Sequence, residues 1–388
     1  MTMRDIAAPS RAPNANAGST VEGCVTTGTH RWRSGLRSLF PVDMRRYRGA
    51  VVLTGVLALP GLLSGCGHPQ GRLFDPIDPP VVWPRPPETA RIRLVGTLSG
   101  SEDLHAARSG MEAFKAAMRG PRPPIKFSSP NMVAIGPAGL LAVSDTGLAA
   151  VHILDLSRRE HRLVSGWQGG AFAIPLGVAW VGRRLFVTDA ERHEVIELDD
   201  QGRFHRRFGE KALVRPVGIA YVAARDQLYV VDGGAHHIVV FDPAGTQVRT
   251  IGRRGTAPGM FNFPTYICNR GERLLVADSG SFRVEMLDLD GKCLRVIGQM
   301  GDGAGDLSLP KGVAFDGDGH VYVVDAHFEN VQIYDGSGRL LLAFGHEGGG
   351  PGEFSLPAGL AIDENNRIWV ADAHNRRLDV FDYLRGSE

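Results

Sequence analysis

A phrase of fourteen residues recurs along this chain at nearly constant spacing. "YVVDAHFENVQIYD" (322–335) returns 47 residues later as "WVADAHNRRLDVFD" (369–382), and four related phrases precede these two. Each copy contains one aspartate at the same place, and successive aspartates stand 43–47 residues apart: Asp145, Asp189, Asp232, Asp278, Asp325 and Asp372. A period of this size, repeated six times, is the sequence signature of a repeat architecture in which neighbouring units share a core.

Each unit follows the same order of segments. A proline opens it, and four short runs rich in Val, Ile, Leu and Tyr follow, separated by turns rich in Gly, Asp and Asn. Such runs predict strands, and the links between them are too short for helical crossovers, so each unit is a four-stranded antiparallel sheet. Six such sheets can bury both faces only by packing around an axis. The sequence therefore predicts an all-β protein, a six-bladed β-propeller of four-stranded antiparallel blades.

The last unit lacks a fourth run after "LDVFD", and a matching segment lies far upstream. "RIRLVG" (91–96) is similar to the fourth runs "QVRTIG" and "CLRVIG". We predict that this N-terminal strand completes the last blade and closes the ring, which leaves no long strand edge exposed. The propeller is then expected to span residues 91–388.

The repeated phrase resembles the NHL repeat of six-bladed propellers. The resemblance rests on "P-x-G-[VIL]-A", "V-x-D" and "[VIL]-x-[VIFLM]-[FLY]-D" in each unit, and it covers roughly 91–388. It implies the propeller fold. It does not imply one function, because propellers of this kind include binding modules, sensor domains and enzymes.

The N-terminal region reads as an export signal. Three arginines precede a mostly apolar run from Ala50 to Leu63, which is too short to span a membrane, and "LSGC" (63–66) resembles a bacterial lipobox. That resemblance implies cleavage before Cys66 and attachment of a lipid to its thiol. We therefore predict a lipoprotein signal peptide at 44–65, preceded at 1–43 by a misassigned or unstructured leader. Residues 66–90 contain seven prolines and are predicted to form an extended tether.

One link of the propeller is longer than the others. The segment "SEDLHAARSGMEAFKAAMRG" (101–120) carries apolar residues at alternating spacings of three and four, which predicts one short inserted helix near 102–119. Its apolar stripe fits packing on the propeller, or docking to a partner or a membrane surface.

Propeller sites usually lie at the channel mouth, here next to the opening prolines and the repeated aspartates. None of the residues that follow the opening prolines is a histidine, and few nearby residues are acids. This departs from the zinc-binding amidating lyase and the calcium-binding lactonases, which the chain resembles in fold. The six repeated aspartates are interpreted as structural acceptors for turn N–H groups. His327 and His374 occupy the same offset in neighbouring blades, too far apart for one metal ion.

The predicted channel has two bulky positions. Four blades place glycine on the crowded inner wall, but blades one and four place Met132 and Tyr266 there. These side chains are expected to approach each other across the axis and either fill a void or line a small pocket. The remaining candidates for binding at the mouth are a polar rim and a basic group: Asn131, Thr265, Lys311, Arg283, His327, His374 and Arg377.

Composition and motifs together favour a binding module. The chain carries a formal net charge of +1 without a basic stripe, so nucleic acid is not an expected partner. No nucleophile–base pair and no metal or cofactor motif is identifiable. We predict a non-catalytic, monomeric binding or scaffold module that faces the periplasm. It is expected to be held by its lipid at the outer membrane, or alternatively the inner one, and to engage a protein or an envelope component. The alternative is a propeller-type hydrolase or lyase acting at the channel mouth.

Overall fold

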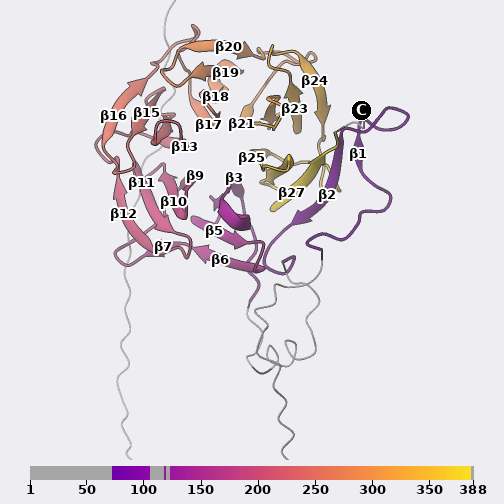
Figure 1. The fold of residues 1–388 in the computed structure, drawn as a ribbon, viewed down its shortest axis with the longest axis horizontal. Coiled ribbons are helices and arrows are strands. Elements are labelled where there is room, and N and C mark those ends of the chain that lie inside the picture. Colours follow the sequence, from indigo (N-terminus) through magenta and orange to yellow (C-terminus); the bar gives the residue numbers. More distant parts are fainter. Residues whose placement is uncertain (1–71, 105–117, 119–122, 386–388) are drawn as a thin grey trace, which may run out of the picture. The chain divides into compact units, whose positions relative to one another are not determined.

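The computed structural model describes residues 72–104, 118 and 123–385, and these form a six-bladed β-propeller. Viewed along the channel, the innermost strands of the six blades surround the centre of the ring, and the outer strands form its rim (Figure 1). The predicted all-β fold class is confirmed. The predicted helix near 102–119 falls almost wholly on residues outside the described ranges, and Ser101–Leu104 form a turn. Within those ranges the regular helical segments are two 3-10 turns, Pro137–Gly139 and Ser279–Ser281.

Within each blade, the strands run in order from the channel outwards. Blade one contains β3 (Pro130–Ile135), β4 (Leu140–Asp145), β5 (Ala150–Asp155) and β6 (Glu160–Val164). Blade two contains β9 (Pro175–Val181), β10 (Arg184–Asp189), β11 (Glu194–Asp199) and β12 (Phe204–Phe208), and the small hairpin β7 (Gly166–Trp167) and β8 (Gly170–Ala171) precedes it. Blade three contains β13 (Pro216–Val222), β14 (Gln227–Asp232), β15 (His237–Phe241) and β16 (Gln247–Ile251).

Blade four contains β17 (Pro264–Arg270), β18 (Arg273–Asp278), β19 (Arg283–Asp288) and β20 (Cys293–Ile297). Blade five contains β21 (Pro310–Phe315), β22 (Val321–Asp325), β23 (Asn330–Tyr334) and β24 (Leu340–Phe344). Blade six contains β25 (Pro357–Ile362), β26 (Arg367–Asp372) and β27 (Arg377–Tyr383), followed by β2 (Ile92–Leu98) and β1 (Val82–Trp83).

Burial explains why the middle strands are apolar along most of their length. Every residue of β4 and β5 is buried, whereas the outer strand β12 is mostly exposed. A strand packed on both faces selects a continuous run of Val, Ile and Leu rather than an alternating pattern. The core therefore lies between adjacent blades, around the whole ring.

The ring is closed by the N-terminal strand, as the sequence predicts. Strand β2 pairs antiparallel with β27, with Ile92 opposite Tyr383 and Leu98 opposite Leu378. Arg93 also reaches Asp382 at 3.1 Å across this pair. The last blade therefore joins two segments from opposite ends of the propeller sequence.

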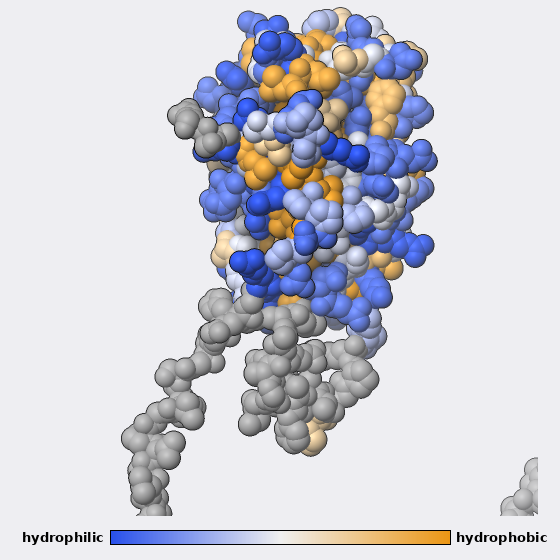
Figure 2. All heavy atoms as spheres, turned by 90° about the vertical axis from the view of Figure 1, so that its right-hand side faces the viewer, coloured by the Kyte–Doolittle hydropathy of each residue, from blue (hydrophilic) through white to orange (hydrophobic). Residues whose placement is uncertain are grey.

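The proline-rich segment packs on the propeller from residue 72 onwards instead of extending away from it. Strand β1 adds a fifth strand to blade six, and the Trp83 ring lies 5.8 Å from the rings of Phe344 and Phe381. Phe74 packs against Trp369, at 6.4 Å, and over Gly96, where a side chain would clash with it. Aromatic burial explains why this part of the predicted tether is held. Hydrophobic side chains gather in patches on the side that carries β1, β2 and β24 (Figure 2).

The predicted signal peptide, the leader and Cys66 lie outside the described residues. Within the described ranges no helix has the length and apolarity needed to cross a membrane.

Candidate functional site

One face of the propeller collects the residues that were predicted to form the mouth. In all six blades the opening proline of the inner strand pairs with the aspartate that ends the second strand, as in Pro310 opposite Asp325. The links between blades and the turns between second and third strands therefore meet on this face, which we call the mouth face.

The repeated aspartates are structural, which confirms their interpretation from the sequence. All six are fully buried. Asp325, for example, accepts hydrogen bonds from the backbone N–H groups of Ser308, Leu309, His327 and Phe328. Each carboxylate thus connects the link before its blade with the turn after the aspartate through hydrogen bonds. These bonds occupy the carboxylate oxygens within the fold.

The inner wall of the channel is too tight for side chains at its glycine positions. A Cβ atom at Gly177, Gly218, Gly312 or Gly359 would collide with the backbone of the next inner strand. Glycine is therefore required at these positions by the close approach of neighbouring blades.

Met132 and Tyr266 lie on the inner strands of opposite blades, and Tyr266 reaches across the ring to blade one. Both are buried in one hydrophobic cluster, and the Tyr266 hydroxyl donates a hydrogen bond to Oδ1 of Asn131 in the opposite blade. Burial raises the pKa of Tyr266, so the phenol stays protonated at neutral pH. This bond joins the inner strands of two opposite blades across the channel.

Thr265 also takes part in the packing of the ring. Its hydroxyl lies 2.6 Å from that of Ser279, which in turn donates to the carbonyl oxygen of Pro310 in the next blade. Ser144 and Thr188 make equivalent bonds from blade one to blade two and from blade two to blade three. The hydroxyl groups therefore serve as links between inner strands.

Lys311 differs from the other predicted rim residues because nothing in the described chain neutralises it. It is half-buried at the start of β21 and makes no ion pair or side-chain hydrogen bond with any described residue. Burial lowers the pKa of its ammonium group. An incompletely solvated cation without a counter-ion is a group that an anionic ligand would stabilise.

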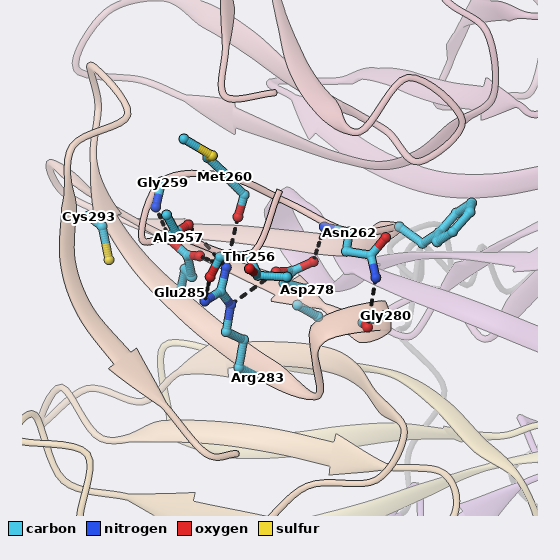
Figure 3. Close-up of polar contacts among 12 residues, drawn as sticks. Thr256, Ala257, Gly259, Met260, Asn262, Asp278, Gly280, Arg283, Glu285 and Cys293 are labelled. Carbon is cyan, nitrogen blue, oxygen red and sulfur yellow. Dashed lines mark hydrogen bonds and ion pairs between the residues drawn. The ribbon is translucent and has the colours of Figure 1, made fainter. Parts of the chain in front are cut away.

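Arg283 and Arg377 do not lie free on the mouth face, contrary to their predicted role. The Arg283 guanidinium is buried between Asp278 and Glu285, and it donates to the backbone carbonyls of Thr256, Ala257 and Met260 (Figure 3). Its N–H groups donate to residues of blade four and of the link before β17, and these bonds fix the position of that link.

Arg377 makes the same arrangement in blade six. It lies between Asp372 and Asp379 and donates to the carbonyl oxygens of Gly349, Gly350 and Glu353. The signal for this role is present in the sequence. In both blades an arginine follows the repeated aspartate by five residues, and an acid follows the arginine by two, in "FRVE" and "RRLD".

Burial also raises the pKa of the carboxyl groups around these arginines. The pKa values of Asp278 and Glu285 are raised by desolvation, against the opposing effect of hydrogen bonds and of Arg283. The pKa of Asp379 is raised well above its usual value by burial and by the neighbouring Asp372. Because these groups are bonded inside the blades, their shifts reflect packing and do not identify an acid–base pair at the mouth.

His327 and His374 remain exposed on the turns of blades five and six. The His327 ring lies 5.6 Å from the Phe328 ring. Elsewhere in the described ranges, one group has the spacing of metal ligands: Asp316, Asp318 and His320, in the turn after β21 on the opposite face. His320 is already bonded to Asp316 at 2.8 Å, and Arg385 pairs with Asp318.

A chain of buried polar groups in blade one was not predicted. Nε2 of His152 lies 3.2 Å from Asp145, and Nδ1 of His152 lies 2.8 Å from Nε2 of His161. Burial, together with the nearby His152, lowers the pKa of His161 to about 3. His152 and His161 are part of no recognisable motif, so nothing in the sequence indicated that their side chains are in contact.

A shallow depression of about 440 Å³ lies away from the channel. It is bounded by Phe208 to Ala212 and by residues of blade three, including Phe241 and Gln247. None of the residues predicted for the mouth contributes to it.

These features define the class of the molecule: a six-bladed β-propeller whose blades are tied together by a repeated proline–aspartate pairing. Residues 311–387 match the family model described as a 6-bladed beta-propeller, and residues 213–241 match the model of the NHL repeat. The predicted resemblance to NHL-repeat propellers is therefore confirmed. No curated protein is a significant match to the chain.

Solved structures share the fold at low sequence identity. An auxiliary nutrient binding protein from Bacteroides ovatus is 13% identical, with a TM-score of 0.54 over 67% of this chain and 70% of that one. A corresponding protein from Bacteroides thetaiotaomicron is 14% identical, with a TM-score of 0.51 and the same coverage. An inactive virginiamycin B lyase from Staphylococcus aureus with quinupristin is 9% identical, with a TM-score of 0.50 over 66% of this chain and 96% of that one. At these identities the similarity concerns the fold alone.

Proposed function

We propose that this protein is a non-catalytic binding module of the cell envelope, anchored through a lipid on Cys66 and engaging a protein or an envelope component through its mouth face. The proposal rests on a difference among the charged side chains of that face: most are bonded within the protein, and one is not. Asp278, Arg283 and their equivalents are bonded internally, whereas the Lys311 ammonium has no partner among the described residues. A closed, rigid ring with an unneutralised cation at its mouth is suited to hold an acidic ligand.

The fold neighbours agree with this proposal. Two of them are named as auxiliary nutrient binding proteins, so a binding role has precedent among propellers of similar fold. The lipobox-like "LSGC" supports a lipid anchor, and Gly67 after the cysteine favours the outer membrane by the sorting rule of enteric-type lipoproteins.

The alternative, a propeller-type hydrolase or lyase, has less support. A lyase is among the fold neighbours. An enzyme would need metal ligands or unbonded carboxylates that converge on the channel. Among the described residues, the carboxyl groups with raised pKa values near the mouth are instead paired with arginines: Asp278 and Glu285 with Arg283, Asp372 and Asp379 with Arg377, and Glu194 with Arg207.

Site-specific photocrosslinking in intact cells tests the binding role of the mouth face. A photoreactive amino acid at His327 is expected to capture a partner. The same amino acid at Glu364, which is exposed in the turn between β25 and β26 on the opposite face, is the matched control. Adducts at Glu364 but not at His327, or none at either position, would show that the mouth face is not the binding surface.

The anchor is tested in the same cells. The Cys66→Ala variant is expected to leave the membrane fraction and to lack the mass of the lipid. If the variant keeps both its mass and its membrane fractionation, Cys66 is not the anchor.

A further inference from the structure

Two large apolar side chains are exposed on the mouth face over blades three and four. Val214, in the link before β13, is 56% exposed, and Phe263, in the link before β17, is 54% exposed. Both lie directly beside strands whose other apolar residues are mostly buried. Exposed apolar side chains at a functional face mark candidate contact residues.

The two side chains border the same turn. Gly234, in the turn after β14, packs closely against Val214 and Arg215. In the same turn the His236 ring packs against Phe263 in a tilted arrangement, with ring centres 4.4 Å apart, and its Nδ1 accepts the Phe263 N–H at 3.0 Å. Val214 and Phe263 therefore belong to one continuous surface.

The backbone holds Phe263 in an unfavourable conformation. Its φ of 50° lies in the left-handed region, which bulky residues rarely adopt. The hydrogen bond to His236 and the bond from the neighbouring Asn262 N–H to Asp278 maintain this geometry. Leu356, which precedes the opening proline of blade six, has the same left-handed backbone (φ 46°), so the conformation belongs to the link and fixes the exposed Phe263 ring in place.

Unpaired cations surround these apolar residues. Lys211, Arg215, Arg253 and Arg254 are all exposed, and none makes an ion pair or a side-chain hydrogen bond with a described residue. The one acid in these two links, Glu210, already pairs with Arg207 at 3.3 Å. The surface therefore carries an uncompensated positive charge.

The loop that carries two of these cations is rigidly held. Arg283 binds the carbonyl groups of Thr256, Ala257 and Met260, and Phe261 bonds back to Arg253 through its N–H. The links of blades five and six instead contain exposed acids such as Asp302 and Glu347. The links before blades three and four are therefore more positive than the links before blades five and six.

We propose that this basic rim, formed by Lys211, Val214, Arg215, Arg253, Arg254 and Phe263, is the docking surface for an acidic segment of a protein partner that places an apolar side chain between its carboxylates. The inference rests on the proposed binding role of the mouth face and adds the chemistry of the partner. Charge complementarity carries it, because four cations without acids select an acidic chain. Two fixed apolar side chains are fewer than a membrane-inserting surface uses, so a protein segment is the better fit.

The test uses a fluorescent peptide with three glutamates on each side of a phenylalanine, and the same peptide with lysine in place of glutamate. The protein is expected to bind the acidic peptide and not the basic one. The Arg253→Glu/Arg254→Glu variant should weaken binding at least tenfold, with the loss reduced at high salt. Phe263→Gly, which suits the left-handed backbone, should also weaken binding without lowering the melting temperature.

The matched control is Lys292→Glu/Arg295→Glu, which makes the same change in net charge at the exposed outer edge of blade four. It is expected to change affinity by less than twofold. Equal loss in the two double variants, or no binding of the acidic peptide by the unmodified protein, overturns the proposal. Binding to vesicles containing phosphatidylglycerol that is lost only in the rim variant would replace the protein partner by a lipid surface.

The photocrosslinking experiment separates the two proposals. If Arg253→Glu/Arg254→Glu leaves the adduct at position 327 unchanged, the basic rim is rejected and the mouth-face function stands. If the unmodified protein gives no adduct from the mouth face, the proposed function itself is rejected.

Discussion

At the scale of single residues, the repeat keeps its shape through buried acceptors. Asp325 receives four backbone N–H groups from two segments that are otherwise loops. Removing a buried carboxylate with several such donors leaves the donors unsatisfied. The repeated aspartates therefore set the positions of the links and turns that build the mouth face.

Asp325→Ala is expected to lower the free energy of unfolding by about 3 kcal/mol, because it strands several buried N–H groups. Asp302→Ala is the control, since Asp302 is exposed and bonded to no described residue. Denaturant unfolding of both variants measures the difference. Similar stability of the two variants would contradict the structural role.

His161 should make stability depend on pH. Its pKa of about 3 in the folded protein lies below the ordinary value of about 6.5, because burial and His152 disfavour its charged form. Below pH 6.5 the unfolded chain therefore takes up a proton that the folded protein refuses, and stability falls as pH decreases towards 3. Replacing His161 with glutamine keeps a polar group that can hydrogen-bond His152 but removes the titration. The loss of stability between pH 7 and pH 5 should then be smaller by roughly 1–2 kcal/mol. Identical pH profiles for the two proteins would show that His161 is not the group responsible.

At the scale of elements, blade six depends on two segments from before the first full blade. Strand β2 pairs with the open edge of β27, and β1 pairs with the outer edge of β2. Trp83 then seals the junction of blades five and six through its contacts with Phe344 and Phe381. The proline-rich segment is thus partly a structural element of the propeller.

A chain that begins at residue 99 should be much less stable than one that begins at residue 72. The shorter chain exposes the edge of β27 and the apolar residues that Ile92, Leu94 and Trp83 cover. Thermal unfolding and gel filtration are the measurements. Equal melting temperatures and equal monomer fractions would contradict closure by β2.

The repeat explains how much of this could be predicted. Strand order, ring closure and the placement of Met132 and Tyr266 in opposite blades follow from periodicity, because a closed six-fold ring fixes which blades are opposite. The hydrogen bonds of Arg283 and Arg377 within their blades could not be predicted in this way. They depend on the direction of each side chain and on the positions of the carbonyl groups in the preceding link, and the repeat period specifies neither. The His152–His161 contact was missed for the same reason.

At the scale of the whole molecule, the propeller presents a rigid face whose links differ in charge. Blades three and four carry the exposed cations of the basic rim, and the links of blades five and six carry acids. Such a distribution orients an approaching partner before contact, since opposite charges attract and like charges repel. The mouth face is therefore tested at two places. Photocrosslinking at His327 tests blade five, and the variants of the basic rim test blades three and four.

Closure by β2 also has a consequence for the order of folding. Arg93 and Asp382 are 289 residues apart in sequence, so the last blade requires one of the longest loops that the chain can close. The entropy of closing such a loop in an otherwise unfolded chain is roughly 5 kcal/mol, but it is far smaller once the intervening blades have folded and brought the two ends together. Blades one to five, whose strand pairings are local, can therefore form as the chain is made. The pairing of β2 with β27 is the final event, and it converts an open arc of blades into a single cooperative unit.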